Sequence, residues 1–364
     1  MVDKHYSQKK SVSIIHPYIE NRLCEIENET YPKNHLWGLD LFENDSFWKF
    51  NFLQTENTLC PKPIERIINK LFFKNSPGIK AEISAWKESL KTDLIYSVCG
   101  PLALSKFYRK TKIAAWVYQK PKNIKQNIID PYSRRNLESH SALLCLTPKA
   151  QKHFSSFTKS KFIPWCIDLK MFDGKAPKTT CNKPFFLATG KTYRDYKTLV
   201  EGAKEVNAEL RIIGPNQQKP ESLPPNVKWL DTSSDPPDQT IDYPTLKEWY
   251  AQCIGVCIPL SGDADDTCGY TNMLEAMAMR KPVLATHSGC LHIKPETDGF
   301  GIQIKPRDST GWTVAMNHLL KDHQKALVMG NHGRKIVERD FSIERFNQNV
   351  LRFIETIVKR VERR

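Results

Sequence analysis

Short apolar runs alternate with amphipathic stretches along the first half of the chain. The apolar runs have the length of buried strands, and we expect strands at 11–15, 93–98, 113–117 and 142–146. Between them, 63–73 and 79–91 repeat apolar residues at helical spacing. Strands and helices that alternate in this way predict an α/β architecture with parallel sheets.

The same pattern starts again in the second half. A polar stretch rich in Gly, Pro and Lys separates the two halves at about 173–183 and suits a linker. Further strands are expected at 185–188, 209–214, 227–230, 255–259, 282–286 and 301–304. A chain of 364 residues is long enough for two domains with full cores. We therefore expect two Rossmann-like domains.

The last part of the pattern is an amphipathic stretch from Ile343 to about Val361. Ser342 suits the N-cap position of a helix there. One apolar stripe is formed by positions 346, 350, 353, 354, 357 and 361. The spacing predicts a long terminal helix with an ordinary packing face.

The stretch 267–289, TCGYTNMLEAMAMRKPVLATHSG, predicts a tight loop, a short helix and a buried strand. Gly269 suits a loop whose backbone comes close to a ligand, and the helix is expected over Met273–Met279. This places Glu275 in the first turn, where a carboxylate can accept hydrogen bonds from hydroxyl groups. A helix N-terminus presents unpaired N–H groups, so the segment suits an anionic or hydroxyl-rich ligand.

Charge adds a second feature, because 54 Lys and Arg against 40 Asp and Glu give a formal net charge of +14. Residues 101–170 carry 14 basic and 3 acidic side chains, and segment 105–136 holds much of this excess. Such a patch attracts phospholipid head groups, nucleic acid or acidic glycans, although a lysine-rich soluble surface would look the same. The aromatic residues expected to contact a membrane interface are Phe107, Tyr108, Trp116 and Tyr118.

The remaining composition bounds the class of protein. With 40% hydrophobic and 26% charged residues, disorder is not expected. No apolar run reaches the roughly 18–20 residues of a membrane span, and the N-terminus lacks the apolar core of a secretory signal. Ten scattered cysteines fit reduced, buried thiols. These features favour a cytoplasmic protein, with peripheral association at the inner membrane face as an alternative.

Several motifs in fixed order resemble retaining family 4 glycosyltransferases (glycosyl transferases group 1). Segment 267–289 resembles the donor-sugar signature, in which Glu275 takes the place of the second glutamate and Thr267 stands at the first. The other matching segments are 162–172 (FIPWCIDLKMF), 192–214 (TYRDYKTLVEGAKEVNAELRIIG), 298–308 (DGFGIQIKPRD) and 340–346 (DFSIERF). From about residue 140 to the end, these matches keep the family's spacing.

The resemblance implies the GT-B fold, in which two Rossmann-like domains face a central cleft. Residues 1–172 would then bind the acceptor and residues 173–342 the nucleotide-sugar donor. The helix 343–364 would cross back to pack on the N-terminal domain. The implied activity is that of a retaining hexosyl- or pentosyltransferase of class EC 2.4. It would use a UDP- or GDP-linked sugar as co-substrate and no other cofactor.

Residues of the donor side are implied by their place in the family's motifs. The positive side chains expected to stabilise the leaving diphosphate are Arg194 and Lys197, with Lys191 as a third. Glu275 would bind the ribose. The remaining donor residues are Gly190, Gly214, Pro215, Leu230, Gly269, Tyr270, Thr271, Asn272 and Leu274. The run Asp263–Asp266 has the form of a metal-binding Asp-x-Asp motif, but we interpret it as loop carboxylates and expect no metal.

The acceptor side matches the family weakly. His35 is the expected active-site histidine, and the other candidates are His16, Trp37, Gly38, Tyr118 and Gln119. In the family the departing phosphate takes the acceptor's proton, so no protein nucleophile is needed. The acceptor would be anionic or membrane-associated, such as a lipid-linked or envelope glycan. Three alternatives stay open: a phage-type glycosyltransferase for modified DNA bases, a nucleotide-sugar 2-epimerase, and a catalytically degenerate protein that binds sugar nucleotides.

Overall fold

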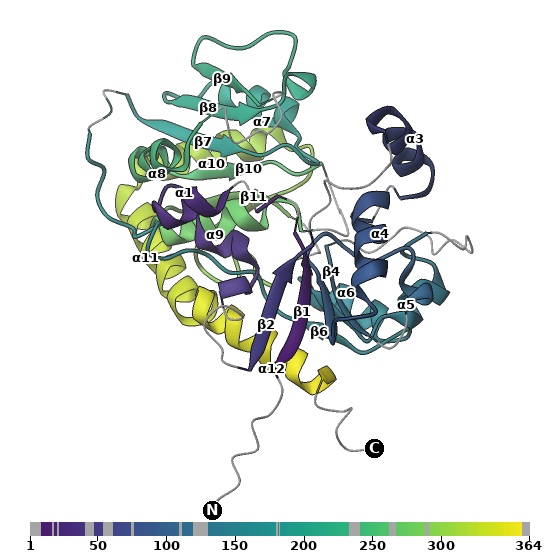
Figure 1. The fold of residues 1–364 in the computed structure, drawn as a ribbon. Helices are drawn as coiled ribbons and strands as arrows, with labels where there is room; N and C mark the ends of the chain where they lie inside the picture. Colours follow the sequence, from purple (N-terminus) through teal and green to yellow (C-terminus); the bar gives the residue numbers. More distant parts are fainter. Residues whose placement is uncertain are drawn as a thin grey trace, which may run out of the picture. The chain divides into compact units, whose positions relative to one another are not determined.

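Two compact units make up the computed structural model (Figure 1). Unit 1 comprises Met1–Leu23, His35–Pro164 and Phe346–Arg364, and unit 2 comprises Cys24–Asn34 and Trp165–Arg345. The residues that the structure describes are 9–16, 18–19, 22–40, 47–53, 61–73, 76–108, 111–118, 130–179, 181, 183–232, 241–261, 267–287 and 291–358.

Unit 1 is built on a six-stranded sheet in which every neighbouring pair is parallel. Its strands are β1 (Lys10–Ile15), β2 (Trp48–Phe52), β3 (Leu94–Ser97), β4 (Lys112–Val117), β5 (Ala142–Cys145) and β6 (Ser160–Phe162). The order across the sheet is β2-β1-β3-β4-β5-β6, so the chain changes direction across the sheet between β1 and β3. In doubly wound sheets, ligands bind at the carboxyl ends of the strands at such a point.

Short helices connect the strands of unit 1. They are α3 (Lys62–Phe72), α4 (Ile79–Glu88), η3 (Ser105–Phe107), α5 (Arg134–Ser139) and α6 (Pro148–Phe154). Both α5 and α6 begin with a capping hydroxyl, because Ser133 and Thr147 accept hydrogen bonds from the third backbone N–H that follows. The apolar strands pack under these helices, for example Ile95 and Ile113 with Ala85, and Leu143 with Phe154.

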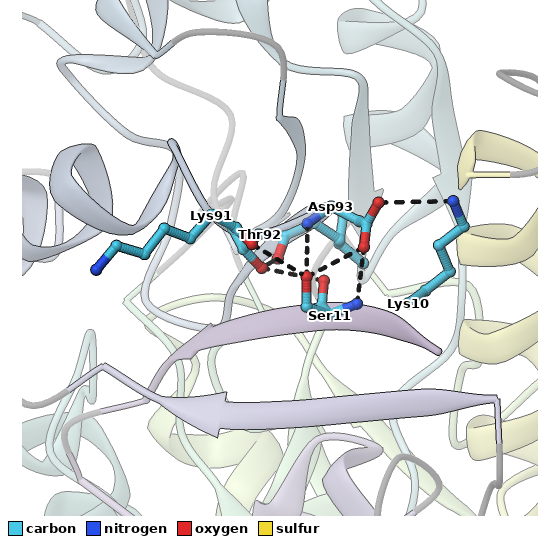
Figure 2. A network of polar contacts seen from close by, with 6 residues as sticks. Lys10, Ser11, Lys91, Thr92 and Asp93 are labelled. Carbon is cyan, nitrogen blue, oxygen red and sulfur yellow. Dashed lines mark hydrogen bonds and ion pairs between the residues drawn. The ribbon is translucent and has the colours of Figure 1, made fainter. Parts of the chain in front are cut away.

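The amino ends of β1 and β3 are joined by a small polar network (Figure 2). Asp93 Oδ2 accepts from the Ser11 backbone N–H at 2.8 Å and from its hydroxyl at 3.1 Å. The Thr92 hydroxyl donates to the Ser11 carbonyl, and the Lys10 ammonium lies 3.6 Å from Asp93 Oδ1. This network satisfies backbone groups at the edge of the sheet opposite the carboxyl ends.

An aromatic cluster fastens the terminal helix α12 (Ile343–Val358) to unit 1. Phe346 stacks on Trp116 with ring centroids 5.4 Å apart, and Trp37 meets Trp116 edge-on at 4.9 Å. The next residue, Asn347, donates from its Nδ2 to the Asp40 carboxylate at 2.8 Å. The N-cap is Ser342 as predicted, because its hydroxyl accepts from the Arg345 N–H.

Unit 2 holds a second parallel sheet. Its strands are β7 (Phe185–Thr189), β8 (Glu209–Gly214), β9 (Val227–Asp231), β10 (Val256–Ile258), β11 (Val283–Thr286) and β12 (Gly301–Ile304). The order is β12-β11-β10-β7-β8-β9, the Rossmann arrangement in which the chain changes direction between β7 and β10. Strands β7, β10 and β11 are buried along their whole length, as expected of a parallel sheet covered on both faces.

The helices of unit 2 are α1 (Leu23–Glu27), α7 (Tyr196–Ala203), α8 (Tyr243–Gln252), α9 (Tyr270–Ala278), α10 (Ser309–Lys321) and α11 (His323–Asp340). Four of them begin at an aspartate whose carboxylate accepts from a backbone N–H of the first turn. Close contacts between α7 and α10 and between α9 and α11 cover the sheet. A Cβ at Gly202 would lie 2.7 Å from Trp312 Cβ, so glycine permits the first of these contacts.

The predicted strands are confirmed to within a residue or two, but two local predictions were wrong. Helix α9 begins at Tyr270 rather than Met273, since Gly269 adopts a left-handed conformation (φ +82°) that starts the helix early. Glu275 therefore lies in the second turn. Of the four aromatic residues expected at an interface, Trp116 is fully buried, Tyr108 and Tyr118 hydrogen-bond inside unit 1, and only Phe107 is exposed, by 53%.

Among the helices in the described part of the chain, none combines the length and apolarity needed to span a membrane.

Candidate active site

The change of direction between β7 and β10 gathers most of the predicted donor residues in unit 2. Gly190 follows β7, Gly214 ends β8, and Gly269 precedes α9. Arg194 forms an isolated bridge with Leu260, which lies just beyond β10. Since the carboxyl ends of parallel strands meet at one edge of the sheet, these loops lie where the fold favours a ligand.

Arg194 is the central cation of this edge. Arg194 as a whole is 9% exposed, and its guanidinium donates to the Thr189 carbonyl at 3.2 Å, the Thr192 carbonyl at 2.9 Å and Asn272 Oδ1 at 2.8 Å. A guanidinium has five N–H groups; besides these three contacts, the Arg194 guanidinium also hydrogen-bonds the Tyr196 hydroxyl. The protein therefore fixes the side chain and its positive charge at this edge, which suits an anion.

A chain of buried polar contacts continues from Arg194 into α9. Asn272 Nδ2 donates to Thr189 Oγ1 at 2.6 Å and lies 3.4 Å from Glu275 Oε2. The same Glu275 oxygen accepts from the Tyr250 hydroxyl at 2.7 Å. Arg194, Thr189, Asn272, Glu275 and Tyr250 thus form one network, which we call the donor-edge network.

Burial changes the titration of this network. Glu275 is 3% exposed, and desolvation raises the pKa of its carboxyl to about 7, although the hydrogen bonds from Tyr250 and Asn272 act in the opposite direction. Burial and the neighbouring carboxylate also raise the pKa of Tyr250, which keeps its hydroxyl protonated as a donor. A carboxyl that titrates near neutral pH changes its charge easily when a ligand offers hydroxyl groups.

Glycine is required at three places around the network. Gly190 has φ +126°, and a side chain there would occupy the space of the Arg194 guanidinium. A Cβ at 214 would lie 2.8 Å from the Tyr196 ring, and a Cβ at 269 would lie 2.6 Å from Ile258 Cγ2. The three glycines therefore keep backbone close to neighbouring side chains, as the sequence predicts for a ligand-binding loop.

Other predicted donor residues lie near this edge without joining the network. Lys197 is exposed on the first turn of α7, and Lys191 is half-buried. Pro215 is buried before η4 (Asn216–Gln218), and Leu230 is half-buried in β9. Thr271 is half-buried, whereas Tyr270 and Leu274 point into the core of unit 2. Arg194 and Lys197 thus have different surroundings, although they are three residues apart.

Sequence reasoning missed Tyr250 and Thr189. Tyr250 lies in α8, 25 residues before the glutamate that it contacts, and its stretch reads as an ordinary amphipathic helix. Thr189 is the last residue of β7, where a polar residue at the carboxyl end of a buried strand was a usable signal.

In unit 1 the change of direction lies between β1 and β3, and His16 follows β1 directly. His16 is 7% exposed and its Nε2 lies 2.8 Å from the His35 carbonyl. A carbonyl only accepts, so Nε2 carries the proton and Nδ1 holds a lone pair. Nδ1 has no hydrogen-bond partner among the described residues. Burial lowers the pKa of His16 to about 4, so the ring is neutral at physiological pH.

The other acceptor-side candidates of unit 1 have varied positions. Burial and the neighbouring His16 lower the pKa of His35 to about 4. Trp37 belongs to the aromatic cluster, and its carbonyl accepts from the Tyr96 hydroxyl at 2.8 Å. Gly38 has φ +86° and faces Val350 of α12. The Tyr118 hydroxyl donates to the Val98 carbonyl after β3, and Gln119 lies outside the described residues.

A cavity of about 580 Å³ in unit 2 includes none of the predicted donor residues. Some of the charged side chains that line this cavity form ion pairs with one another, as Lys170 does with Glu29. Within the described ranges, no three His, Cys, Asp or Glu side chains are grouped as metal ligands would be. The run Asp263–Asp266 lies outside those ranges.

Comparison with known proteins connects this geometry to one class of enzyme. Residues 185–322 match the family model of glycosyl transferases group 1. Sucrose-phosphate synthase from Thermosynechococcus elongatus has a similar structure, with a TM-score of 0.64, 16% identity, and coverage of 96% of this chain and 99% of that one. No curated protein sequence matches the chain.

Two further solved structures are similar to this chain over nearly its whole length. HepE from Anabaena, in complex with UDP and glucose, has a TM-score of 0.60 and 13% identity over 95% of this chain and 100% of its own. A glycosyltransferase from Rickettsia africae has a TM-score of 0.61 and 14% identity over 97% and 100%. Both similarities extend over nearly the whole chain, which contains the two parallel sheets, so the predicted GT-B fold is confirmed.

Residues 185–322 are therefore a glycosyl transferases group 1 domain, and the chain is a glycosyltransferase of the GT-B type. This confirms the family resemblance and the enzyme class EC 2.4 that it implied.

Proposed function

We propose that the protein is a retaining glycosyltransferase that moves a sugar from a nucleotide-diphosphate sugar to an anionic or membrane-associated acceptor. The donor-edge network is the observation that carries this proposal, because it presents a fixed cation beside a buried carboxyl. A leaving diphosphate needs a fixed cation to stabilise its charge, and ribose hydroxyls can donate hydrogen bonds to a buried carboxyl.

Arg194 would bind the diphosphate through its remaining N–H and its positive charge, with Lys191 and Lys197 adding further positive charge. Glu275 would accept hydrogen bonds from the ribose, and the loop at Gly269 would approach the sugar. As the bond between the anomeric carbon and phosphate breaks, charge grows on the phosphate oxygen and Arg194 stabilises it. The acceptor oxygen bonds to the same face of the anomeric carbon, and its proton passes to the departing phosphate.

Thermal denaturation with UDP, GDP, ADP and CMP tests the donor. The HepE structure contains UDP, so UDP is the first candidate and GDP the second. At a hundred times its dissociation constant, the correct nucleotide should stabilise the protein by roughly 2.7 kcal/mol. Absence of a shift with all four would contradict the donor site and favour the degenerate alternative. Release of the nucleotide without any acceptor product would favour the epimerase alternative.

His16 is the residue of unit 1 that we assign to the acceptor. Its Nδ1 lone pair lies at the carboxyl end of β1; the atom is buried, so an acceptor hydroxyl would donate to it only after neighbouring groups move aside. Since burial lowers the pKa of its imidazole to about 4, this role should persist across the physiological pH range. His35 supplies the carbonyl that orients the ring.

Replacing His16 by alanine should lower sugar transfer to a soluble alkyl glycoside acceptor by about tenfold, the scale of one lost hydrogen bond. The affinity for the nucleotide, measured by calorimetry, should stay unchanged because His16 belongs to unit 1. Equal transfer by His16→Ala and wild type would remove the assignment. A pKa of His16 near 6.5, measured from its imidazole nitrogen chemical shifts, would show that the ring is not held neutral by burial. The physical basis of the assignment would then be lost.

The chemistry of the acceptor follows from charge. Much of the basic segment 105–136 lies outside the described residues; in the described part, Lys106 lies 4.7 Å above the Phe107 ring and Arg134 pairs with Glu138. Positive charge of this density suits a lipid-linked or envelope glycan and would also suit DNA. Flotation with liposomes against a duplex gel shift separates these two acceptor classes.

A further inference from the structure

Helix α3 presents a row of aliphatic side chains to solvent. None of its eleven residues is buried. Ile64 is 51% exposed, Ile67 60% and Leu71 65%. Residues three and four apart lie on the same side of a helix, so these three form one continuous row. We call it the aliphatic row.

The polar side of α3 holds the helix to the rest of unit 1. The Glu65 carboxylate lies 2.9 Å from the Lys80 ammonium, and Asn69 Oδ1 accepts from the Ile79 N–H at 2.8 Å at the start of α4. Ile67 is two residues from each of Glu65 and Asn69, which is about 200° around the helix. The aliphatic row therefore points away from α4, and Figure 1 shows α3 attached to unit 1 beside that helix.

Positive charge accompanies the aliphatic row. Lys62, Arg66 and Lys70 are spaced by four residues and are all exposed. The acidic residue of the helix, Glu65, already has a lysine partner. The helix therefore combines an exposed aliphatic side with an exposed cationic side, which are the two properties of helices that lie in the interface of a membrane.

We propose that α3 docks on an anionic phospholipid bilayer, with the aliphatic row in the acyl boundary and Lys62, Arg66 and Lys70 at the head groups. Protein interfaces favour aromatic residues and Met in their cores and are poor in lysine, whereas the aliphatic row is Ile and Leu beside two lysines. The helix is about 16 Å long, so it lies along the surface rather than across it. The proposal goes beyond the proposed function, because docking needs no nucleotide sugar.

Vesicle co-sedimentation of the full chain tests the proposal, with phosphatidylcholine alone and with phosphatidylglycerol added. Wild type should bind the anionic vesicles, and Ile67→Ser/Leu71→Ser should lower the partition coefficient at least about tenfold. Arg66→Glu/Lys70→Glu should cause a similar loss on anionic vesicles only. All positions changed are exposed, so the denaturation midpoint should stay close to that of wild type.

Matched controls lie on α11 of unit 2. Leu327 and Val328 are each 58% exposed, and Lys325 and Lys335 are exposed on the same helix. Leu327→Ser/Val328→Ser and Lys325→Glu/Lys335→Glu repeat the same chemical changes and should leave vesicle binding unchanged.

Failure of wild type to bind anionic vesicles, or equal losses in the α3 and α11 variants, would overturn the proposal. The proposal would also be overturned if light scattering showed a dimer of the wild type that Ile67→Ser/Leu71→Ser dissociates. A second copy of the chain would then cover the aliphatic row. Nucleotide binding is measured separately, so failure here leaves the donor assignment standing.

Discussion

Arg194→Ala is expected to lower kcat/KM for the nucleotide sugar by about a hundredfold or more. Loss of one preorganised donor to a developing negative charge has this magnitude in other enzymes. Here the guanidinium is already held by Thr189, Thr192 and Asn272, so little ordering remains to be done when the diphosphate arrives. Nucleotide release from UDP-glucose and GDP-mannose, followed continuously, measures the effect.

Lys204→Ala is the matched control for this substitution. Lys204 caps the other end of α7 and pairs with Glu201 on the exposed surface, so its loss should change kcat/KM little. Arg194→Lys should recover only part of the activity, because an ammonium cannot reproduce three fixed contacts and a fork toward phosphate. A kcat/KM for Arg194→Ala within threefold of wild type, with unchanged folding, would be incompatible with Arg194 as the diphosphate ligand.

Glu275→Gln is expected to stabilise the protein more at pH 8 than at pH 5. The carboxyl titrates at about 7 in the folded protein, against 4.5 for an unperturbed glutamate. The folded state therefore binds the proton more tightly, and the free energy of unfolding falls as pH rises from about 4.5 to about 7. The full difference is about 3 kcal/mol, at about 1.4 kcal/mol for each pH unit.

Glutamine does not titrate, and its amide oxygen can still accept from the Tyr250 hydroxyl. The gain should thus be below about 1 kcal/mol at pH 5 and approach about 3 kcal/mol at pH 8, which corresponds to about 4 °C in the denaturation midpoint of a 364-residue chain. The exposed Glu201→Gln should show no such pH dependence. A gain for Glu275→Gln that is larger at pH 5 than at pH 8 would contradict the raised pKa. Despite its stability, this variant should bind nucleotide more weakly, because it offers ribose no carboxylate.

These two predictions combine residues that differ in how far the sequence revealed them. Arg194 and Glu275 could be named from the sequence, because a short motif resembles a family's donor loop. Their connection through Asn272 could not, since 78 residues separate Arg194 from Asn272. Tyr250 gave no sequence signal at all. Its hydroxyl acquires a role only because α8 and α9 bring it to Glu275.

The acceptor side shows the same limit. His16 and His35 were both candidates, and only the backbone path after β1 shows that the His35 carbonyl fixes the ring of His16. Trp116 and Tyr118 were expected at a surface because lysines surround them in sequence. In the fold they are enclosed, because β4 is a central strand covered on both faces.

The sequence by itself determined most strands of the two parallel sheets, the terminal helix and the resemblance of the second half to a glycosyltransferase family. Those features depend on local periodicity, caps and short motifs, which act over a few residues. Only the tertiary structure decided which polar groups are buried together, which histidine nitrogen is free, and that α3 keeps its aliphatic row in solvent. Burial, pKa and exposure depend on neighbours distant in the chain, and topology alone brings those neighbours together.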